Sequence, residues 1–241
     1  MALAKQLSFY CNGIDLAANA IKSFDASGEA EELDTTTLGD SMKSFITGYS
    51  NGTLSAEGIW AFDSTDLDEI HNIFTTAFIS GAEAVITATL APAAVGVDTI
   101  MMNAVETSYG INNELGALIM VTADFRATTG MAVGKWLFNA AVDTTTTNGT
   151  GVGKGATTAN GGLFQIHWQN GAGTEDITAK IQHSVDNSTW VDLGTITKTN
   201  VTGFGADSLE IAPGTTVNEY IRAQIAVAQG AVNVQAAFAR R

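Results

Sequence analysis

Residues 24–62, FDASGEAEELDTTTLGDSMKSFITGYSNGTLSAEGIWAF, form the stretch of this 241-residue chain that decides the fold. From Gly52 onward, apolar side chains alternate with polar ones, as in a strand with one buried face. The part before it is acidic and contains a Gly39-Asp40 turn. We therefore predict a long β-hairpin arm, whose far end has too little apolar surface to fold without a neighbouring subunit. The apolar side carries Leu54, Ala56, Trp60 and Phe62, and the polar side carries Thr53, Ser55 and Glu57.

The composition predicts a protein made mainly of β-sheet. Hydrophobic residues make up 45% of the chain, which suffices for a packed core, whereas charged residues reach only 15%. Glycine, threonine and serine are abundant, as in sheets joined by tight turns. Cys11 is the single cysteine, so no internal disulfide and no oxidising compartment is indicated. The N-terminus lacks the pattern of a signal peptide, and no apolar run reaches the ~18–20 residues of a membrane span.

The charge is unevenly distributed along the chain. Residues 1–148 contain 18 acidic and 5 basic side chains, a net charge of −13, whereas residues 149–241 contain 7 and 6, a net charge of −1. A surface this acidic does not bind nucleic acid, because phosphate contacts need lysine and arginine. It is, however, suited to lining a passage that must not hold nucleic acid.

One helix is predicted, after the arm. Ser64 or Thr65 caps it, carboxylates follow in its first turn, and Gly81 ends it. Its apolar stripe suits a helix that lies across a sheet. The stripe consists of Leu67, Ile70, Phe74, Ala77 and Phe78.

The other elements before residue 140 are strands. Residues 6–16 predict a strand, an Asn12-Gly13 turn and a return strand. In the strand 117–127, one face carries Ile119, Val121, Ala123 and Phe125, and the other carries Thr122, Asp124 and Arg126. Further strands are predicted at 84–90, 98–109 and 131–138.

The second half is predicted to be a separate β-domain. Residues 143–162 have no periodicity and are rich in Gly and Thr, which indicates a linker. Six to eight short strands follow, as in a small Ig-like or jelly-roll β-sandwich. The predicted organisation is thus one domain over 1–142, a linker over 143–162 and a second domain over 163–241. GVGKG at 151–155 does not satisfy the phosphate-loop pattern.

No pattern for catalysis, a metal or a cofactor is present. His71, predicted on the exposed side of the helix, His167 and His183 lack the spacing of a metal site, and there is no GxSxG nucleophile. Asp186 and Asp192 flank Trp190, where a turn around a core tryptophan is favoured over a calcium or sugar site. We predict a protein that is not an enzyme and has no cofactor.

The order and spacing of several segments resemble the tail tube (major tail) proteins of long-tailed bacteriophages. The first ~140 residues match in YCNGIDL at 10–16, in the acidic arm 29–60 with the helix after it, and in the strand–turn–strand 101–130. IQHSVDNSTWVDLG at 181–194 and IAPGTTVNEYIRAQ at 211–224 look like the β-sandwich domain appended in some of these phages.

The resemblance implies a structural virion protein, made in the host cytoplasm and assembled into the tail. Its hexameric rings would stack into a negatively lined tube through which DNA is ejected without specific binding and without membrane insertion. Four strands per subunit would build a 24-stranded inner barrel. They are 45–49 and 53–60 of the arm, with 98–109 and 117–127. Further partners implied are the tape measure, tail terminator and distal tail proteins.

The resemblance also assigns roles to residues. The polar-face residues are expected to face the lumen, and Arg126 to pair with a carboxylate such as Asp124 of an adjacent strand. The acidic loop 29–40 is expected to reach a neighbouring subunit. The lumen set is Thr53, Ser55, Glu57, Thr122, Asp124 and Arg126; the intersubunit set is Glu29, Glu31, Glu32, Asp34, Asp40 and Lys43.

Two alternatives stay open at this point. The first is a capsid decoration or cement protein, which would also be acidic and β-rich but would form trimers on a shell. The second is a carbohydrate-binding adhesin acting through the second half, with Trp168, Trp190 and Tyr220 as candidate glycan contacts.

Overall fold

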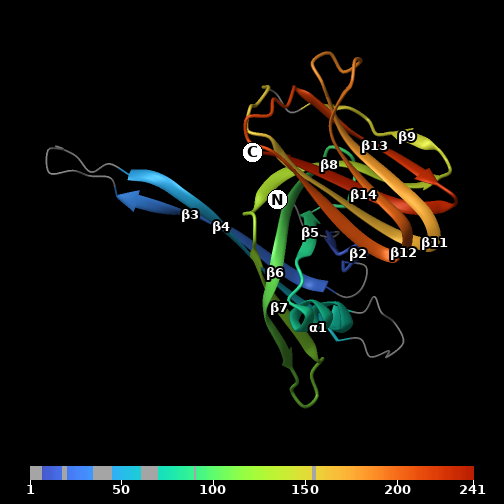
Figure 1. Cartoon of the computed structure of the whole chain (residues 1–241). Coiled ribbons are helices and arrows are strands. Elements are labelled where there is room, and N and C mark those ends of the chain that lie inside the picture. The colour runs from blue at the N-terminus through green and yellow to red at the C-terminus, as the bar shows by residue number, and fades with distance from the viewer. Residues whose placement is uncertain (1–6, 18–20, 35–44, 61–69, 90, 154–155) are drawn as a thin grey trace, which may run out of the picture.

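The computed structural model describes residues 7–17, 21–34, 45–60, 70–89, 91–153 and 156–241. This part of the chain contains fourteen strands, all linked in one sheet network, and a single helix (Figure 1). The mainly β fold predicted from composition is confirmed. The elements are β1 Ser8–Cys11, β2 Ile14–Asp15, β3 Ile21–Asp34, β4 Phe45–Ile59, α1 Ile70–Ser80, β5 Ala84–Thr89, β6 Asp98–Asn112, β7 Met120–Ala127, β8 Ala132–Asp143, β9 Thr146–Asn148, β10 Val152–Gly153, β11 Gly162–Ser184, β12 Val191–Ile211, β13 Tyr220–Ala228 and β14 Ala231–Arg240.

The predicted hairpin arm is formed by β3 and β4, which project from the body of the molecule in Figure 1. Two details of the prediction are wrong. The acidic segment 29–34 belongs to β3 rather than to a loop, and the strands expected at 45–49 and 53–60 are one strand, β4. Pairing continues through Gly28 opposite Gly52 and Glu29 opposite Asn51, so the Asn-Gly pair makes no turn. The predicted Gly39-Asp40 turn lies outside the described residues.

The first half has its core between a sheet and α1. Phe74 of α1 packs edge-on against Phe125 of β7, with ring centroids 5.6 Å apart, and both rings are buried. Gly81 ends the helix as predicted, with a φ of +60° and its N–H donating to the carbonyl of Ala77. Phe78 was predicted in the buried stripe but is 45% exposed, and Ile73 is buried instead. The predicted cap and Leu67 lie outside the described part of the chain.

The second half is built on two strands far longer than predicted. β11 has 23 residues and β12 has 21, and they pair along most of their length. Register shifts interrupt the pairing, and residues with positive φ, Asn170 and Gly173 in β11 and Asn200 and Gly203 in β12, occur near these irregularities. Bulges of this kind let a strand bend without ending, which explains why turn-forming residues here do not separate short strands.

The segment 143–162, predicted as a linker, carries two short strands. β9 and β10 both pair with β13, so much of this segment lies along the sheet of the second half. The sheet itself is continuous between the halves, because β8 pairs with β6 through residues 132–135 and with β14 through 135–143. The division into domains 1–142 and 163–241 stays a prediction.

A buried series of hydrogen bonds joins the two halves. The N–H of Gly13 donates to Nδ1 of His167 (3.2 Å), so the neutral imidazole carries its proton on Nε2, 2.9 Å from the Thr87 hydroxyl. Thr87 donates to Oε1 of Gln165 (2.7 Å), and the Gln165 amide donates to the Met102 carbonyl and to Asn103 Oδ1, both at 2.9 Å. His167, Gln165 and Thr87 are at most 1% exposed. Each donor in this series of hydrogen bonds therefore has an acceptor, as is required of buried polar groups.

Candidate functional site

The candidate site is the polar face of a four-stranded sheet section with the order β3-β4-β7-β6. Residues paired across neighbouring strands project to the same face. The six residues predicted to face a lumen meet as three such pairs between β4 and β7. The pairs are Thr53 with Arg126, Ser55 with Asp124, and Glu57 with Thr122.

Burial confirms the alternation from which this face was predicted. On the other side of the same strands, Leu54, Ala56, Val121 and Phe125 are buried under α1 and β1. The polar residues are exposed, apart from Glu57, which is half-buried. The sequence pattern therefore identified both faces of β4 and β7 correctly. Whether the polar face lines a lumen stays a prediction.

Short hydrogen bonds tie the polar side chains of this face to each other. The Ser55 hydroxyl donates to Asp124 Oδ1 at 2.5 Å, and Ser27 and Thr53 share a bond of 2.8 Å between their hydroxyls. From β6, the Thr107 hydroxyl donates to the Asp124 carbonyl at 3.1 Å. Side-chain hydrogen bonds thus link β3 to β4, and separately link β4 to β7 and β7 to β6.

The charge on this face is predominantly negative. The β3 residues opposite β4 add Asp25 and Glu29 to the carboxylates of Glu57 and Asp124. Arg126 is the one cation among the polar-face residues named here, and no ion pair between Arg126 and Asp124 is present in the described part of the protein. The face is also concave. A hollow of about 470 Å³ is lined by Glu29, Asn51, Thr53, Ser55, Thr107, Asp124, Phe125 and Arg126.

Both edges of this sheet section are free of partners within the described residues. β3 pairs only with β4, and residues 105–112 of β6 pair only with β7. Unpaired edges expose rows of backbone N–H and C=O groups that readily accept another strand. The section is thus able to add a strand on either side.

The predicted intersubunit residues fall in three places. Glu29 is exposed on β3, opposite Asn51. Glu32 and Asp34 pair through their backbones with Thr47 and Phe45 further out on the arm, where Glu31 also lies. Asp40 and Lys43 lie outside the described residues. Contact with a neighbour stays a prediction for all six.

The three candidate glycan contacts do not form one stacking surface. Trp168 is only 9% exposed and packs in the core of the second half over Gly205, where an added Cβ would meet the indole at 2.3 Å. The Trp190 ring is covered on one face by the Arg222 guanidinium, 4.3 Å from the ring centroid. Tyr220 is half-buried beside Gly153.

The carboxylates around Trp190 have structural roles. Asp186 accepts hydrogen bonds from the N–H groups of Ser188 and Thr189 and from the Ser184 hydroxyl, which keep the pKa of its carboxyl below the usual range. Asp192 is bound by Lys180 at 2.7 Å and Gln182 at 2.6 Å, and its pKa is also lowered. The predicted turn is therefore confirmed, but Trp190 is half-buried and does not belong to the core.

The histidines and Cys11 are held in separate environments. His71 was predicted to face solvent but is half-buried, stacked on Trp60 with centroids 4.4 Å apart and bonded to the Tyr109 hydroxyl. His183 accepts from the N–H of Asn218 at 3.1 Å. Cys11 is fully buried, which raises the pKa of its thiol to about 12.

No acidic, His or Cys cluster that would hold a metal occurs within the described residues. In the same part of the chain, no helix has the length and hydropathy of a membrane span.

Comparison with known proteins gives structural likenesses only. No family model matches the chain, and no curated protein sequence matches it. Among solved structures, a chain from the tail of an empty gene transfer agent particle, refined with C6 symmetry, has a TM-score of 0.42 and 15% identity, covering 55% of this chain and 98% of that one. The Dit protein of phage SPP1, described as a hub of the adsorption apparatus, has a TM-score of 0.42 and 12% identity, covering 97% and 99%. A chain of the phage p2 baseplate has a TM-score of 0.37 and 8% identity, covering 98% and 99%.

These three chains come from a tail, an adsorption apparatus and a baseplate, respectively. Likenesses this distant do not decide the function.

Proposed function

We propose that the chain is a structural subunit of a phage-type tail, in which copies join edge to edge into a ring. The observation that supports this most strongly is the β3-β4-β7-β6 section, which has a concave acidic face and, within the described part of the chain, an unpaired edge on each side. Pairing β3 of one copy with residues 105–112 of β6 in the next would satisfy both edges. Closing the sheet in this way removes the exposed edges that would otherwise cause aggregation.

The acidic face would become the inner wall of the ring. The opposite face is covered by α1 and the first-half core, so only the polar face is free to line an opening. Asp25, Glu29, Glu57 and Asp124 would repel a DNA backbone and prevent it from binding. Six subunits per ring, and stacking of rings into a DNA conduit, are taken from the resemblance to tail tube proteins.

Electron microscopy and native mass spectrometry of the purified full chain test this proposal. Rings of six copies are expected, and stacked rings would identify the tube role. Trimers that bind capsid shells would instead identify a cement protein, and a monomer at every concentration would contradict the proposal. Binding of the full chain to a broad glycan array is the test of the adhesin alternative.

Charge reversal of Glu57 tests the lumen assignment. In Glu57→Lys, rings and tubes are expected to form, because the side chain lies on the polar face and its one hydrogen bond in the described residues, from Ser23, is long at 3.4 Å. The new cations would bind the DNA backbone, so DNA ejection from particles carrying the variant should slow and should recover at high salt.

Asp143→Lys is the matched control, because it changes the net charge equally on an exposed residue that lies outside the polar face, at the end of β8 opposite Ala231 of β14. It should eject DNA at the normal rate. Equal rates for the two variants would remove Glu57 from the lumen.

A further inference from the structure

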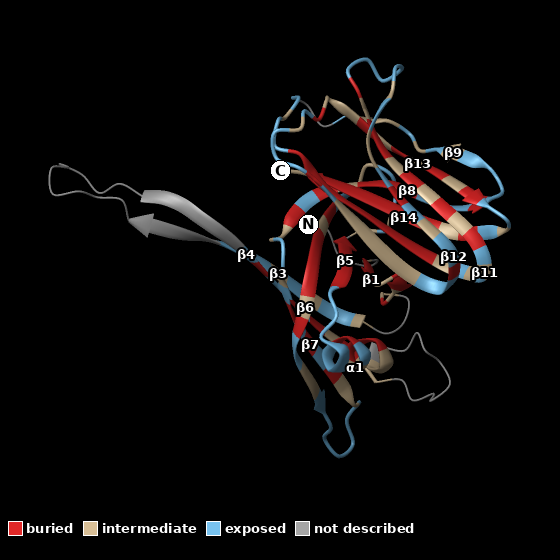
Figure 2. Ribbon diagram, viewed as in Figure 1, coloured by how far each residue is buried: buried red, intermediate tan, exposed pale blue. Residues whose placement is uncertain are grey.

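The turn between β6 and β7 presents an apolar side chain at its apex. The N–H of Ala117 donates to the Glu114 carbonyl at 3.0 Å, and Gly116 supplies the positive φ of +86° that this turn requires. Leu115 is therefore fully exposed at 107%, and Leu118 beside it is 65% exposed. Figure 2 shows this hairpin tip standing clear of the body. Turn apices are normally polar, so two exposed leucines here indicate a contact surface.

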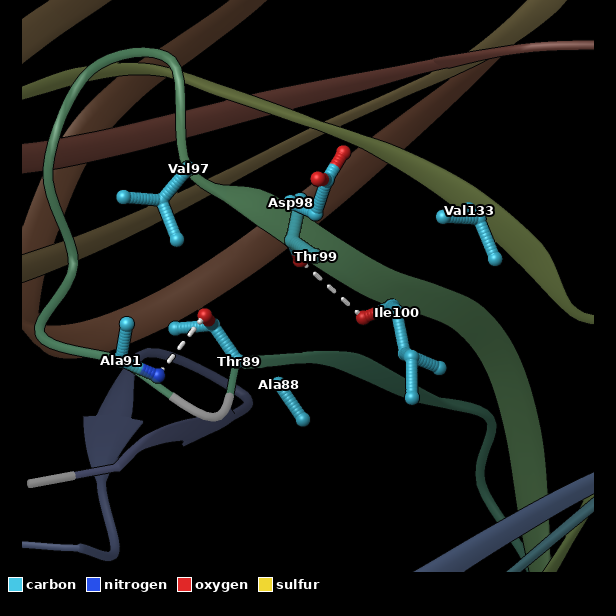
Figure 3. A pocket seen from close by; sticks show the side chains of 8 residues that line it. All are labelled: Ala88, Thr89, Ala91, Val97, Asp98, Thr99, Ile100 and Val133. Carbon is cyan, nitrogen blue, oxygen red and sulfur yellow. Dashed lines mark hydrogen bonds between the residues drawn. The ribbon is translucent and has the colours of Figure 1, made fainter. Parts of the chain in front are cut away.

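An apolar hollow of about 340 Å³ lies at the other end of β6 (Figure 3). Its polar groups are already bonded: the Thr99 hydroxyl donates to the Ile100 carbonyl, and the N–H of Ala91 donates to the Thr89 hydroxyl, both at 3.2 Å. Val133, on its rim, is 54% exposed. The hollow is lined by Ala88, Thr89, Ala91, Val97, Asp98, Thr99, Ile100 and Val133.

The tip and the hollow have complementary chemistry. Asp98, the only charged residue in the lining, is paired with Lys135 at 2.9 Å, so a leucine entering the hollow would meet no uncompensated charge. The side chains of Leu115 and Leu118 are of a size to bury against Ile100 and Val133. Burial of one leucine is a stabilisation large enough to change an association constant about ten-fold or more.

Their positions suit a contact between copies of this chain. Asp98, which helps to line the hollow, is the first residue of β6, and the tip follows Asn112, its last residue, so the two lie at opposite ends of one strand. Figure 1 shows the course of β6. From Ile100 to Asn112, an extended strand spans about 40 Å. A surface at one end that fits a different surface at the other end gives a head-to-tail contact, which does not close on itself and builds a filament.

We propose that the β6–β7 tip of each subunit inserts Leu115 and Leu118 into the apolar hollow beside Ile100 and Val133 of a subunit in the next ring. This inference rests on the proposed ring and specifies how rings stack. The axial repeat of the tube would then be no more than about 45 Å, because strand tilt shortens the projected length of β6.

Leu115→Asp is the first test, measured by native mass spectrometry for rings and by negative-stain images for tubes. Rings should persist, because the ring-closing edges are untouched, whereas tubes should need at least ten-fold more protein. Val185→Asp is the control, since Val185 is 67% exposed on the β11–β12 turn of the other half, and it should form tubes normally.

Each outcome separates the two proposals. Tubes from Leu115→Asp at the wild-type concentration would overturn the tip-and-hollow contact and leave the ring proposal intact. Wild-type protein that forms no rings would refute the proposed function, and this inference with it.

A cysteine pair tests the contact directly. In Leu115→Cys with Val133→Cys, oxidation of assembled tubes should produce a ladder of covalent multimers, because each subunit is linked to one above and one below. Neither single variant should produce it, and the buried Cys11 does not react. A covalent dimer without larger products would mean a two-fold contact and would contradict the proposal.

Discussion

Lowering the pH from 7 to 4 is expected to destabilise the protein by about 3 kcal/mol through His167 alone. Complete burial lowers the pKa of this imidazole to about 3, from an ordinary value of 6.5. Between these two values the unfolded chain binds a proton and the folded chain does not. The stabilisation is therefore complete above pH 6.5 and is lost as the pH falls toward 3. Protonation would also place a donor on Nδ1, against the N–H of Gly13.

Urea unfolding of the wild type and His167→Gln at pH 7, 6, 5 and 4 measures this effect, at one protein concentration because assembly adds to stability. The variant should lose about 2–4 kcal/mol at pH 7, since buried partners are left unpaired. Its loss between pH 7 and 4 should be about 3 kcal/mol smaller than that of the wild type.

His183→Gln is the comparison, because His183 also has a lowered pKa but is only half-buried. Its pH dependence should stay close to that of the wild type. If His167→Gln and the wild type lose equal stability on acidification, His167 is not the group that titrates.

The polar face was predictable because its signal is local. In β4 and β7 a polar residue alternates with a residue that packs under α1, and a strand has only two faces, so Ser55 and Asp124 had to project away from the core. The hairpin arm followed from the same alternation. The alternation pattern failed at the acidic segment 29–34. Its composition suggested a loop, but backbone pairing with β4 makes it a strand.

The buried hydrogen bonds between the two halves were not predictable, because the residues that form them are distant in sequence. Gln165 and His167 alternate with Phe164 and Ile166, so they read as the polar face of a strand. They are buried by Thr87 and by residues near 102–103, which lie about 60–80 positions away along the chain. Nothing local distinguishes a solvated glutamine from one whose hydrogen bonds are all satisfied inside a protein.

The surroundings of the candidate glycan residues were not predictable for a similar reason, and glycan binding itself stays a prediction. Trp168 and Trp190 stand near turns and polar residues, which is the composition of a sugar-binding surface. Their availability depends on Gly205 and Arg222, which come from other strands and occupy the space over each ring.

Glu106→Gln is expected to stabilise the protein by about 3 kcal/mol at pH 7 and by less than about 1 kcal/mol at pH 5. Glu106 lies on β6 opposite Phe125, is 6% exposed, and neither carboxyl oxygen has a hydrogen-bond partner within the described residues. Burial, and secondarily the charge of Asp124, raise the pKa of this carboxyl to about 8. The folded protein thus keeps a proton that the unfolded chain releases above pH 4.5, so stability falls as the pH rises from 4.5 to 8.

Glutamine keeps the shape of the side chain without a charge, so unfolding measured from pH 5 to 9 isolates the cost of ionisation. Glu114→Gln is the control: Glu114 is exposed, and its removal should change stability by less than about 0.5 kcal/mol at any of these pH values. His167 and Glu106 oppose each other, because the first favours high pH and the second favours low pH. The two opposing contributions to the free energy of unfolding, added together, place the stability maximum of the wild type in mildly acidic solution. Glu106→Gln should extend that maximum toward pH 8. If the free energy of unfolding falls equally steeply with rising pH in the wild type and in Glu106→Gln, the Glu106 carboxylate ionises in contact with water.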